Sequence, residues 1–161
     1  MTMEDIEALA AGPLFGFADW PNPAVPNKKA GVYTIWDGDE LVYVGMAGRG
    51  MRVDDQRADA AGESSRPRGL RGRLGSHASG RRSGDQFCID VFDRLVLPAL
   101  SGAQIAAAGS GELSLDEETR RYIRDRLSYR FAVTDDARST RVLERRVQRE
   151  GLRGRRLLLN P

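Results

Sequence analysis

The sequence predicts an α/β (α+β) fold: a small, mainly antiparallel sheet flanked by helices, with an inserted strand and helix. The first supporting observation is a pair of β-branched and aromatic segments, 31–36 and 41–45, joined by a turn sequence. The second is a set of segments with apolar residues every three or four positions, which is typical of amphipathic helices. The third is size, because 161 residues with 40% hydrophobic side chains suit one domain with a core. We therefore expect a single domain over residues 1–161.

The N-terminal part of the chain contains a predicted helix and the predicted hairpin. Residues 2–11 have the apolar spacing of a short helix. An extended lead-in follows, because prolines interrupt it at Pro13, Pro21, Pro23 and Pro26. We expect residues 1–30 to form an extension of the core domain. The Asp37-Gly38 pair favours a tight turn between the two strands.

The rest of the chain alternates predicted helices and strands. In chain order we expect a loop rich in Gly, Asp and Arg at 46–69, a helix at 70–78, a strand at 86–97, a helix beginning after Ser114, a strand at 129–134 and a helix at 137–150. The strand at 86–97 rests on the alternation of Phe87, Ile89 and Val91. Ser114 is followed three residues later by Glu117, which is the pattern of a capping box.

The composition excludes several classes of protein. No apolar run approaches the roughly 18–20 residues of a membrane span, and the acidic N-terminus is unlike a secretory signal. The single cysteine, Cys88, excludes an internal disulfide and a multi-cysteine zinc site, and we interpret it as structural. We therefore expect a cytoplasmic protein with no membrane partner.

Positive charge is concentrated in two segments, although the formal net charge is only +2. Residues 64–84 contain arginines and no acidic residue, and residues 141–156 contain seven arginines against Glu144 and Glu150. Local basic clusters favour a polyanionic partner more than the net charge does. The alternative interpretation is a solvated face crossed by salt bridges.

Two short segments of the hairpin, Gly31-Val32-Tyr33 and Tyr43-Val44-Gly45, place two tyrosines ten residues apart. Further residues follow in order: an arginine in a Leu-x-x-Arg segment (Arg73), a histidine one helical turn later (His77), a glutamate in the last helix (Glu144) and an asparagine near the end (Asn160). This order of residues on these predicted elements resembles the GIY-YIG nuclease superfamily. The resemblance covers residues 31–161.

The resemblance implies a divalent-metal-dependent endonuclease that hydrolyses phosphodiester bonds, with DNA as the expected substrate. Glu144 would bind one Mg²⁺ or Mn²⁺ ion, since such ions prefer carboxylate and water oxygens. Arg73 would stabilise negative charge on the phosphate. Tyr33 is favoured as the general base, Tyr43 as a second ligand of the attacking water or phosphate, and His77 as the group that orients the nucleophile or Tyr33. Which of these three is the base stays open.

The remaining site residues have supporting roles. Asn160 would fix the geometry of the glutamate or of a tyrosine hydroxyl, provided that the C-terminal leucines dock on the core. The residues expected to contact nucleic acid are Gly45, Arg49, Arg71, Arg81, Arg82 and Arg145.

Three features depart from the family's pattern and leave the physiological substrate open. Met46 stands where several relatives carry a lysine, the 46–69 loop is long, and residues 83–127 resemble an insertion. One alternative is a catalytically weak nucleic-acid-binding or toxin-like module that keeps the fold, and another is an RNA nuclease. The oligomeric state is also left open.

Overall fold

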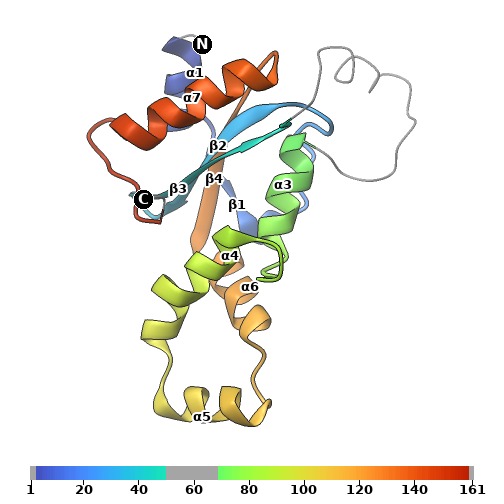
Figure 1. The fold of residues 1–161 in the computed structure, drawn as a ribbon, viewed down its shortest axis with the longest axis vertical. Helices are drawn as coiled ribbons and strands as arrows, with labels where there is room; N and C mark the ends of the chain where they lie inside the picture. The colour runs from blue at the N-terminus through green and yellow to red at the C-terminus, as the bar shows by residue number, and fades with distance from the viewer. Residues whose placement is uncertain (1–2, 50–68, 160–161) are drawn as a thin grey trace.

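A four-stranded sheet separates two groups of helices in the computed structural model, which describes residues 3–49 and 69–159 (Figure 1). The strands are β1 (Phe15–Gly16), β2 (Gly31–Asp37), β3 (Glu40–Ala47) and β4 (Leu127–Val133). They lie in the order β1-β4-β2-β3, and each neighbouring pair is antiparallel. Within the described residues β2 is therefore an inner strand and β3 an edge strand. The predicted small antiparallel sheet is confirmed.

Helices cover both faces of this sheet. The α-helices of the described chain are α1 (Met3–Ala11), α3 (Gly69–Ala78), α4 (Gln86–Val91), α5 (Gly102–Ser110), α6 (Leu115–Arg126) and α7 (Ala137–Glu150). Shorter helical segments are η1 (Phe17–Asp19), η3 (Phe92–Val96) and η4 (Leu97–Ala99). Side chains of α1 and α7 form one core with the sheet, and side chains of α3, α4 and α6 form the other. The predicted helices at 2–11, 70–78 and 137–150 are confirmed.

The inner strand β2 is buried on both sides because each face meets one of these cores. Tyr33 and Ile35 point into the core shared with α3, α4 and α6, whereas Val32 and Trp36 point into the core shared with α1 and α7. Successive side chains of a strand point to opposite faces, so this alternation is expected for a covered strand. The strand therefore delivers Tyr33 to the α3 side of the sheet.

The predicted strand at 86–97 is wrong, because these residues form α4, then η3 as a π-helix, then η4 as a 3-10 helix. Asp85 caps α4, since its carboxylate accepts the Phe87 N–H at 3.1 Å. Phe87, Cys88 and Val91 are buried together on one side of the helix. The predicted inserted strand is therefore absent, because residues 86–126 consist of helices joined by short turns.

Residues 86–126 form a helical arm that extends away from the sheet and turns back at α5 (Figure 1). None of the residues of α5 is buried. A capping box between Ser101 and Gln104 begins this helix, and Gly111 ends it in the left-handed conformation. The tip of the arm is therefore held by local hydrogen bonds rather than by a core.

The C-terminal segment returns to the edge strand. The Leu158 N–H donates to the Leu41 carbonyl oxygen at 3.1 Å, and the Leu159 N–H donates to the Val42 carbonyl oxygen at 2.9 Å. Leu159 is only 2% exposed. The predicted docking of the C-terminal leucines is confirmed for this residue. No helix among the described residues has the length and apolar character needed to cross a membrane.

Candidate active site

The hairpin places Tyr33 directly across from Gly45. These two residues are partners in the antiparallel pairing of β2 with β3. A Cβ atom at Gly45 would collide with the Tyr33 hydroxyl and with the ring of Tyr43. The Tyr33 side chain therefore requires a glycine at position 45. This contact explains Gly45 within the fold, whereas the sequence predicts a contact between Gly45 and nucleic acid.

Helix α3 brings His77 to this tyrosine. The Tyr33 hydroxyl and His77 Nε2 lie 2.7 Å apart, although the residues are 44 positions apart in the chain. Both side chains are 0% exposed. The sequence places His77 at the rim of the core, and this is wrong, because the start of the helical arm covers the imidazole.

Two residues complete the surroundings of His77: Asp85, which directly precedes the arm, and Phe87 at its start. Asp85 Oδ2 lies 2.7 Å from His77 Nδ1, and Asp85 is 2% exposed. The Phe87 ring packs on the imidazole with centroids 4.4 Å apart, and it also meets the Tyr43 ring at 5.0 Å. Tyr33, His77 and Asp85 are thus linked in a buried row of hydrogen bonds.

Burial sets the protonation states in this row. It lowers the pKa of His77, while the hydrogen bond and charge of Asp85 oppose this effect. Burial and the nearby Tyr43 raise the pKa of Tyr33 well above its ordinary value, against the charge and hydrogen bond of Arg73. Near neutral pH the imidazole and the phenol are therefore both uncharged.

Arg73 approaches the same tyrosine from the solvent side. Its side chain is exposed, one helical turn before the buried His77, and its positive charge acts on the Tyr33 phenol, where it opposes the effect of burial on the pKa. Burial raises the pKa values of Tyr43 and Glu144, and the charge of Arg73 opposes this effect at both groups. The predicted position of Arg73 at the rim of the core is confirmed, and it connects the buried row to the surface.

Glu144 reaches the site from α7, on the other side of the sheet. Its charge raises the pKa of Tyr43, which shows that the two groups are close enough to interact. Burial raises the pKa of Glu144, and the charges of Arg49, Arg141, Arg145 and Arg73 oppose this only in part. The structure therefore brings Tyr33, Tyr43, Arg73 and His77 together on the α3 side of the sheet, and the charge of Glu144 acts on Tyr43 and Arg73 from α7.

The Glu144 carboxylate has the donor chemistry that a divalent cation requires. The carboxylate is half-buried, and its pKa stays raised by burial in spite of four arginine charges, so the chain does not fully offset its negative charge. Its oxygens are hard ligands of the kind that Mg²⁺ and Mn²⁺ accept. The donor chemistry at Glu144 therefore suits the expected metal ion.

A second group of possible metal ligands has a different explanation. Atoms of His77, Asp85 and Cys88 lie within 4.8 Å of one another. The Cys88 thiol donates to the His77 carbonyl oxygen at 3.6 Å, and burial raises its pKa well above the ordinary value. All three side chains already have hydrogen-bond partners within the fold, so we interpret this cluster as a hydrogen-bonded one, with Cys88 in the predicted structural role.

The arginines predicted to contact nucleic acid divide into two groups. Arg49, Arg81 and Arg145 are exposed. Arg71 instead donates to the carbonyl oxygens of Val25 and Asn22 at 3.0 and 3.2 Å, which anchors the N-terminal lead-in. Arg82 pairs with Asp116 at 2.9 Å and stacks over Phe92, so it holds the arm together. Asn160 lies outside the described residues.

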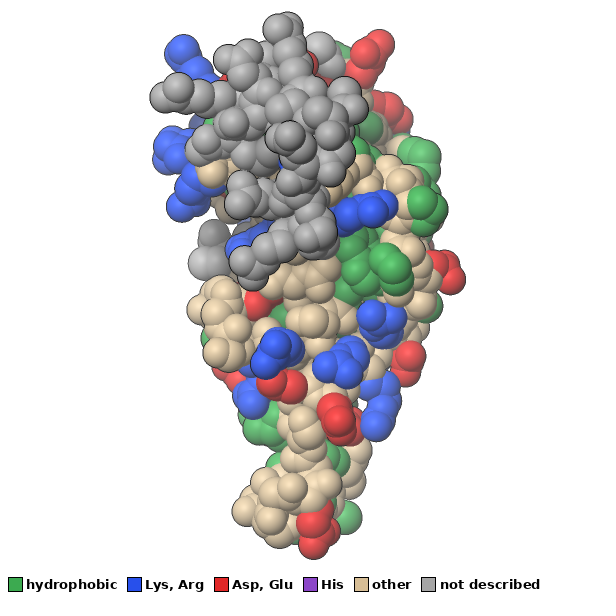
Figure 2. Space-filling model, turned by 90° about the vertical axis from the view of Figure 1, so that its right-hand side faces the viewer, with side chains coloured by type: hydrophobic (Ala, Val, Ile, Leu, Met, Phe, Trp, Pro, Cys, Tyr) green, Lys and Arg blue, Asp and Glu red, His purple; other side chains and the backbone are tan. Residues whose placement is uncertain are grey.

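The charge on the arm is mixed rather than basic. Figure 2 shows Lys or Arg side chains next to Asp or Glu side chains along this face of the arm, below the residues drawn in grey. Ion pairs of the arm include Arg82 with Asp116 and Arg121 with Glu118. The arm is therefore a weaker candidate for phosphate contacts than the arginines around Glu144.

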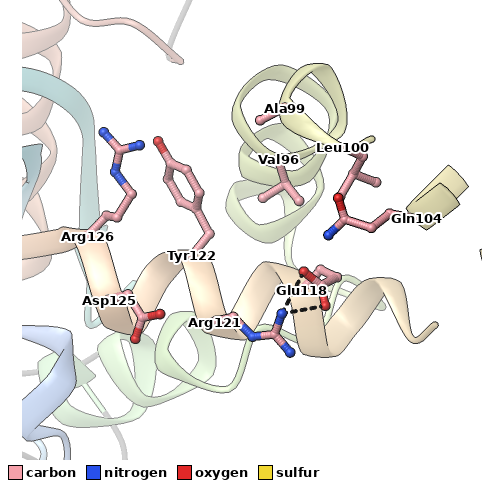
Figure 3. Close-up of a pocket in the computed structure, with 9 residues that line it drawn as sticks. All are labelled: Val96, Ala99, Leu100, Gln104, Glu118, Arg121, Tyr122, Asp125 and Arg126. Atoms are coloured by element: carbon pink, nitrogen blue, oxygen red, sulfur yellow. Dashed lines mark hydrogen bonds and ion pairs between the residues drawn. The ribbon is translucent and has the colours of Figure 1, made fainter. Parts of the chain in front are cut away.

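A cavity of about 230 Å³ lies inside the arm, away from these residues (Figure 3). Its lining residues are Val96, Ala99, Leu100, Gln104, Glu118, Arg121, Tyr122, Asp125 and Arg126. Tyr122 donates its hydroxyl to Asp37 at 2.7 Å, and Arg126 also reaches Asp37, at 3.3 Å. These contacts tie the arm to the hairpin turn, and the cavity contains none of the predicted site residues.

Comparison of the chain with protein-family models, with curated proteins and with solved structures found no match. The functional interpretation therefore depends on the residues themselves. Sequence reasoning missed two of them, Asp85 and Phe87. A signal for Asp85 was present, because an aspartate directly before an apolar segment is a helix N-cap pattern.

Proposed function

We propose that this chain is a divalent-metal-dependent endonuclease of the GIY-YIG type that hydrolyses phosphodiester bonds in DNA. The observation that carries the proposal is the buried hydrogen bond between Tyr33 and His77, with the positive charge of Arg73 acting on the same phenol. The first of these residues comes from the hairpin, and the other two lie one turn apart on α3. A buried phenol that is hydrogen-bonded to a base, with an exposed cation acting on it, is an arrangement suited to proton transfer beside a phosphate.

Glu144 would hold the metal ion. When bound, a divalent cation there supplies charge that polarises the phosphate and stabilises the leaving oxygen. Glu144 contributes a half-buried carboxylate for this purpose. Arg49, Arg141 and Arg145 are exposed around it and provide positive charge for flanking phosphates.

Tyr33 and His77 would act together as the general base. The raised pKa of Tyr33 means that a free phenolate is scarce at neutral pH. If Tyr33 passes its own proton to His77 Nε2 as it takes one from water, no free phenolate is required. The proton then rests on the imidazole, which is neutral beforehand because burial lowers the pKa of His77.

Arg73 would bind the substrate phosphate next to Tyr33. In the structure its positive charge acts on the Tyr33 phenol, and arginine binds phosphate strongly and in a defined geometry. A phosphate held by Arg73 would place the attacking water close to the Tyr33 oxygen. Tyr43, with its ring 6.4 Å from that of Tyr33, lies beside this route.

The test is a nicking assay on supercoiled plasmid with Mg²⁺ or Mn²⁺. We expect the wild type to cleave, chelation of the metal to stop cleavage, and Glu144→Ala and Arg73→Ala each to lose about 10²-fold or more. Glu112→Ala and Arg94→Ala are matched controls, because both residues are exposed on the arm, and they should cleave like the wild type. Equal cleavage by all five proteins would contradict the site assignment.

Full burial of Tyr33 favours a second candidate, a nucleic-acid-binding module that does not cleave. This candidate predicts salt-sensitive binding of DNA without nicking under any metal condition. Repeating the assay with RNA separates the RNA nuclease from both. Cleavage of RNA alone would keep the site and change the substrate.

A further inference from the structure

The hydrogen bonds through His77 have a direction that the Asp85 carboxylate imposes. An ionised carboxylate can only accept, so His77 Nδ1 carries a proton that it donates to Asp85. The Nε2 atom of the neutral imidazole then has no proton, so the Tyr33 O–H donates to it across 2.7 Å. The neutral imidazole is thereby held in the Nδ1–H tautomer, with the Nε2 lone pair facing the phenol.

Asp85 itself is fixed by the fold. Its second oxygen, Oδ1, accepts the Phe87 N–H at 3.1 Å as the N-cap of α4. The His77 bond uses Oδ2, so one carboxylate serves two partners. At 2% exposure, solvent water competes little for either oxygen. The carboxylate is therefore oriented before any proton moves.

We propose that Asp85 is a positioning residue of this site, which holds His77 in the tautomer that accepts the Tyr33 proton and stabilises the imidazolium that results. The inference rests on the proposed function. The proton balance is simple: water gives a proton to the Tyr33 oxygen, the original Tyr33 proton moves to His77 Nε2, and the Nδ1 proton stays shared with Asp85. No oxidant, reductant or further reactant is needed.

The other groups around His77 do not replace this carboxylate. Arg73 opposes a positive imidazole by its charge. Tyr33, Tyr43, Phe87 and Cys88 also pack on His77 or hydrogen-bond to it, and none is ionised near neutral pH. Asp85 is thus the only negative charge among the described residues in contact with the ring. An imidazolium formed at this buried position depends on it.

Two substitutions separate this role from helix capping. Asp85→Ser keeps an oxygen for the α4 cap but is too short to hold the imidazole. Asp85→Asn keeps the cap and the length, but it removes the charge, and its amide can donate to Nδ1 and so favour the other tautomer. Asp93→Asn is the matched control, because Asp93 is exposed on the same arm. If Asp85 only caps α4, all three variants should behave like the wild type.

The first readout is the ¹⁵N NMR spectrum of the imidazole, which is unambiguous because the chain has one histidine. We expect the wild type and Asp93→Asn to show a protonated Nδ1 and an unprotonated Nε2 at pH 7.5. Asp85→Ser and Asp85→Asn should shift population toward Nε2–H. An Nε2–H tautomer in the wild type, or an unchanged Nδ1–H tautomer in Asp85→Ser, would overturn the proposal.

The second readout is the pH dependence of single-turnover plasmid nicking at saturating metal. Loss of the Asp85 charge should lower the plateau rate by roughly 10²-fold and move the acid limb to lower pH, since protonated His77 loses its stabilising partner. A lower plateau with an unmoved limb would overturn the role of the charge. If the wild type does not nick plasmid at all, the proposed function fails, and the NMR result still decides the tautomer.

Discussion

Helices α3 and α4 pack on the same face of the sheet, yet they carry different information in their sequences. In α3 the apolar residues Leu70, Leu74 and Ala78 recur every four positions, and the helix is predicted correctly. In α4, Phe87, Ile89 and Val91 alternate, and a strand is predicted where six helical residues stand. A segment this short fits a period of two and a helical face equally well.

One half of the candidate site can therefore be identified from the sequence, and the other half cannot. α3 supplies Arg73 and His77, which a motif can identify. The start of α4 supplies the carboxylate and the ring that bury His77, and neither belongs to the motif. The burial and protonation state of His77 therefore depend on a segment that carries no motif in the sequence.

The largest expected effect comes from a substitution that removes the α4 side of this arrangement. Phe87→Ala deletes a ring that is 1% exposed and packs on both His77 and Tyr43. We expect a loss of about 3–5 kcal/mol in the free energy of unfolding, measured with urea. We also expect the pKa of His77 to rise toward its ordinary value, because the imidazole gains contact with solvent.

Leu74→Ala is the matched change on the α3 side. Leu74 is 0% exposed, so a loss of about 2–5 kcal/mol is expected. Phe87 stays over the imidazole in this variant, so the pKa of His77 should remain low. Equal rises in the pKa of His77 in both variants would show that Phe87 has no special role in burying the imidazole.

A smaller effect compares a glycine of the hairpin with a glycine of the arm. Gly45→Ala places a methyl group against the Tyr33 hydroxyl, and overpacking of this kind costs about 1–3 kcal/mol. Gly109→Ala in α5 meets nothing within 4 Å and should be neutral or stabilising by up to about 1 kcal/mol. Thermal unfolding of the two variants measures this contrast. Equal stability of Gly45→Ala and wild type would show that Tyr33 moves without cost.

The smallest effect is a pH dependence of stability that arises from the His77 row. Burial lowers the pKa of His77 from its ordinary 6.5, so the unfolded chain binds this proton more readily than the native one. Stability should therefore fall as the pH is lowered through 6.5, by at most about 1.4 kcal/mol per pH unit. Urea titrations between pH 7.5 and 5 test this slope.

His77→Gln is the control, because it removes the only histidine and should flatten this part of the curve. Asp85 acts in a lower range. Burial favours its neutral form, yet its bond to His77 and the positive charge nearby lower its pKa below 3.8 overall. Its contribution is therefore present above pH 3.8 and lost as the pH falls further. A flat curve for the wild type from 7.5 to 5 would contradict the low pKa of His77.

Much of the architecture could be predicted from local pattern alone. The hairpin, α3, β4 and α7 all have a clear period or a clear terminal signal, such as Asp136, whose side chain caps α7. Local propensity is enough for these elements, because each is long enough for its pattern to be recognised. The candidate residues Tyr33, Tyr43, Arg73, His77 and Glu144 were selected differently, because their order on these elements resembles the pattern of GIY-YIG nucleases.

Contact between these residues is a different matter, because it depends on packing across many positions of the chain. No local rule shows that Asp85 meets His77, that Phe87 covers it, or that Gly45 lies under the Tyr33 hydroxyl. Burial then sets the pKa of each group, and burial is a property of the assembled core. The sequence thus determines the residue types of the site. Their protonation states and hydrogen-bond partners are determined by the packing of the arm on α3.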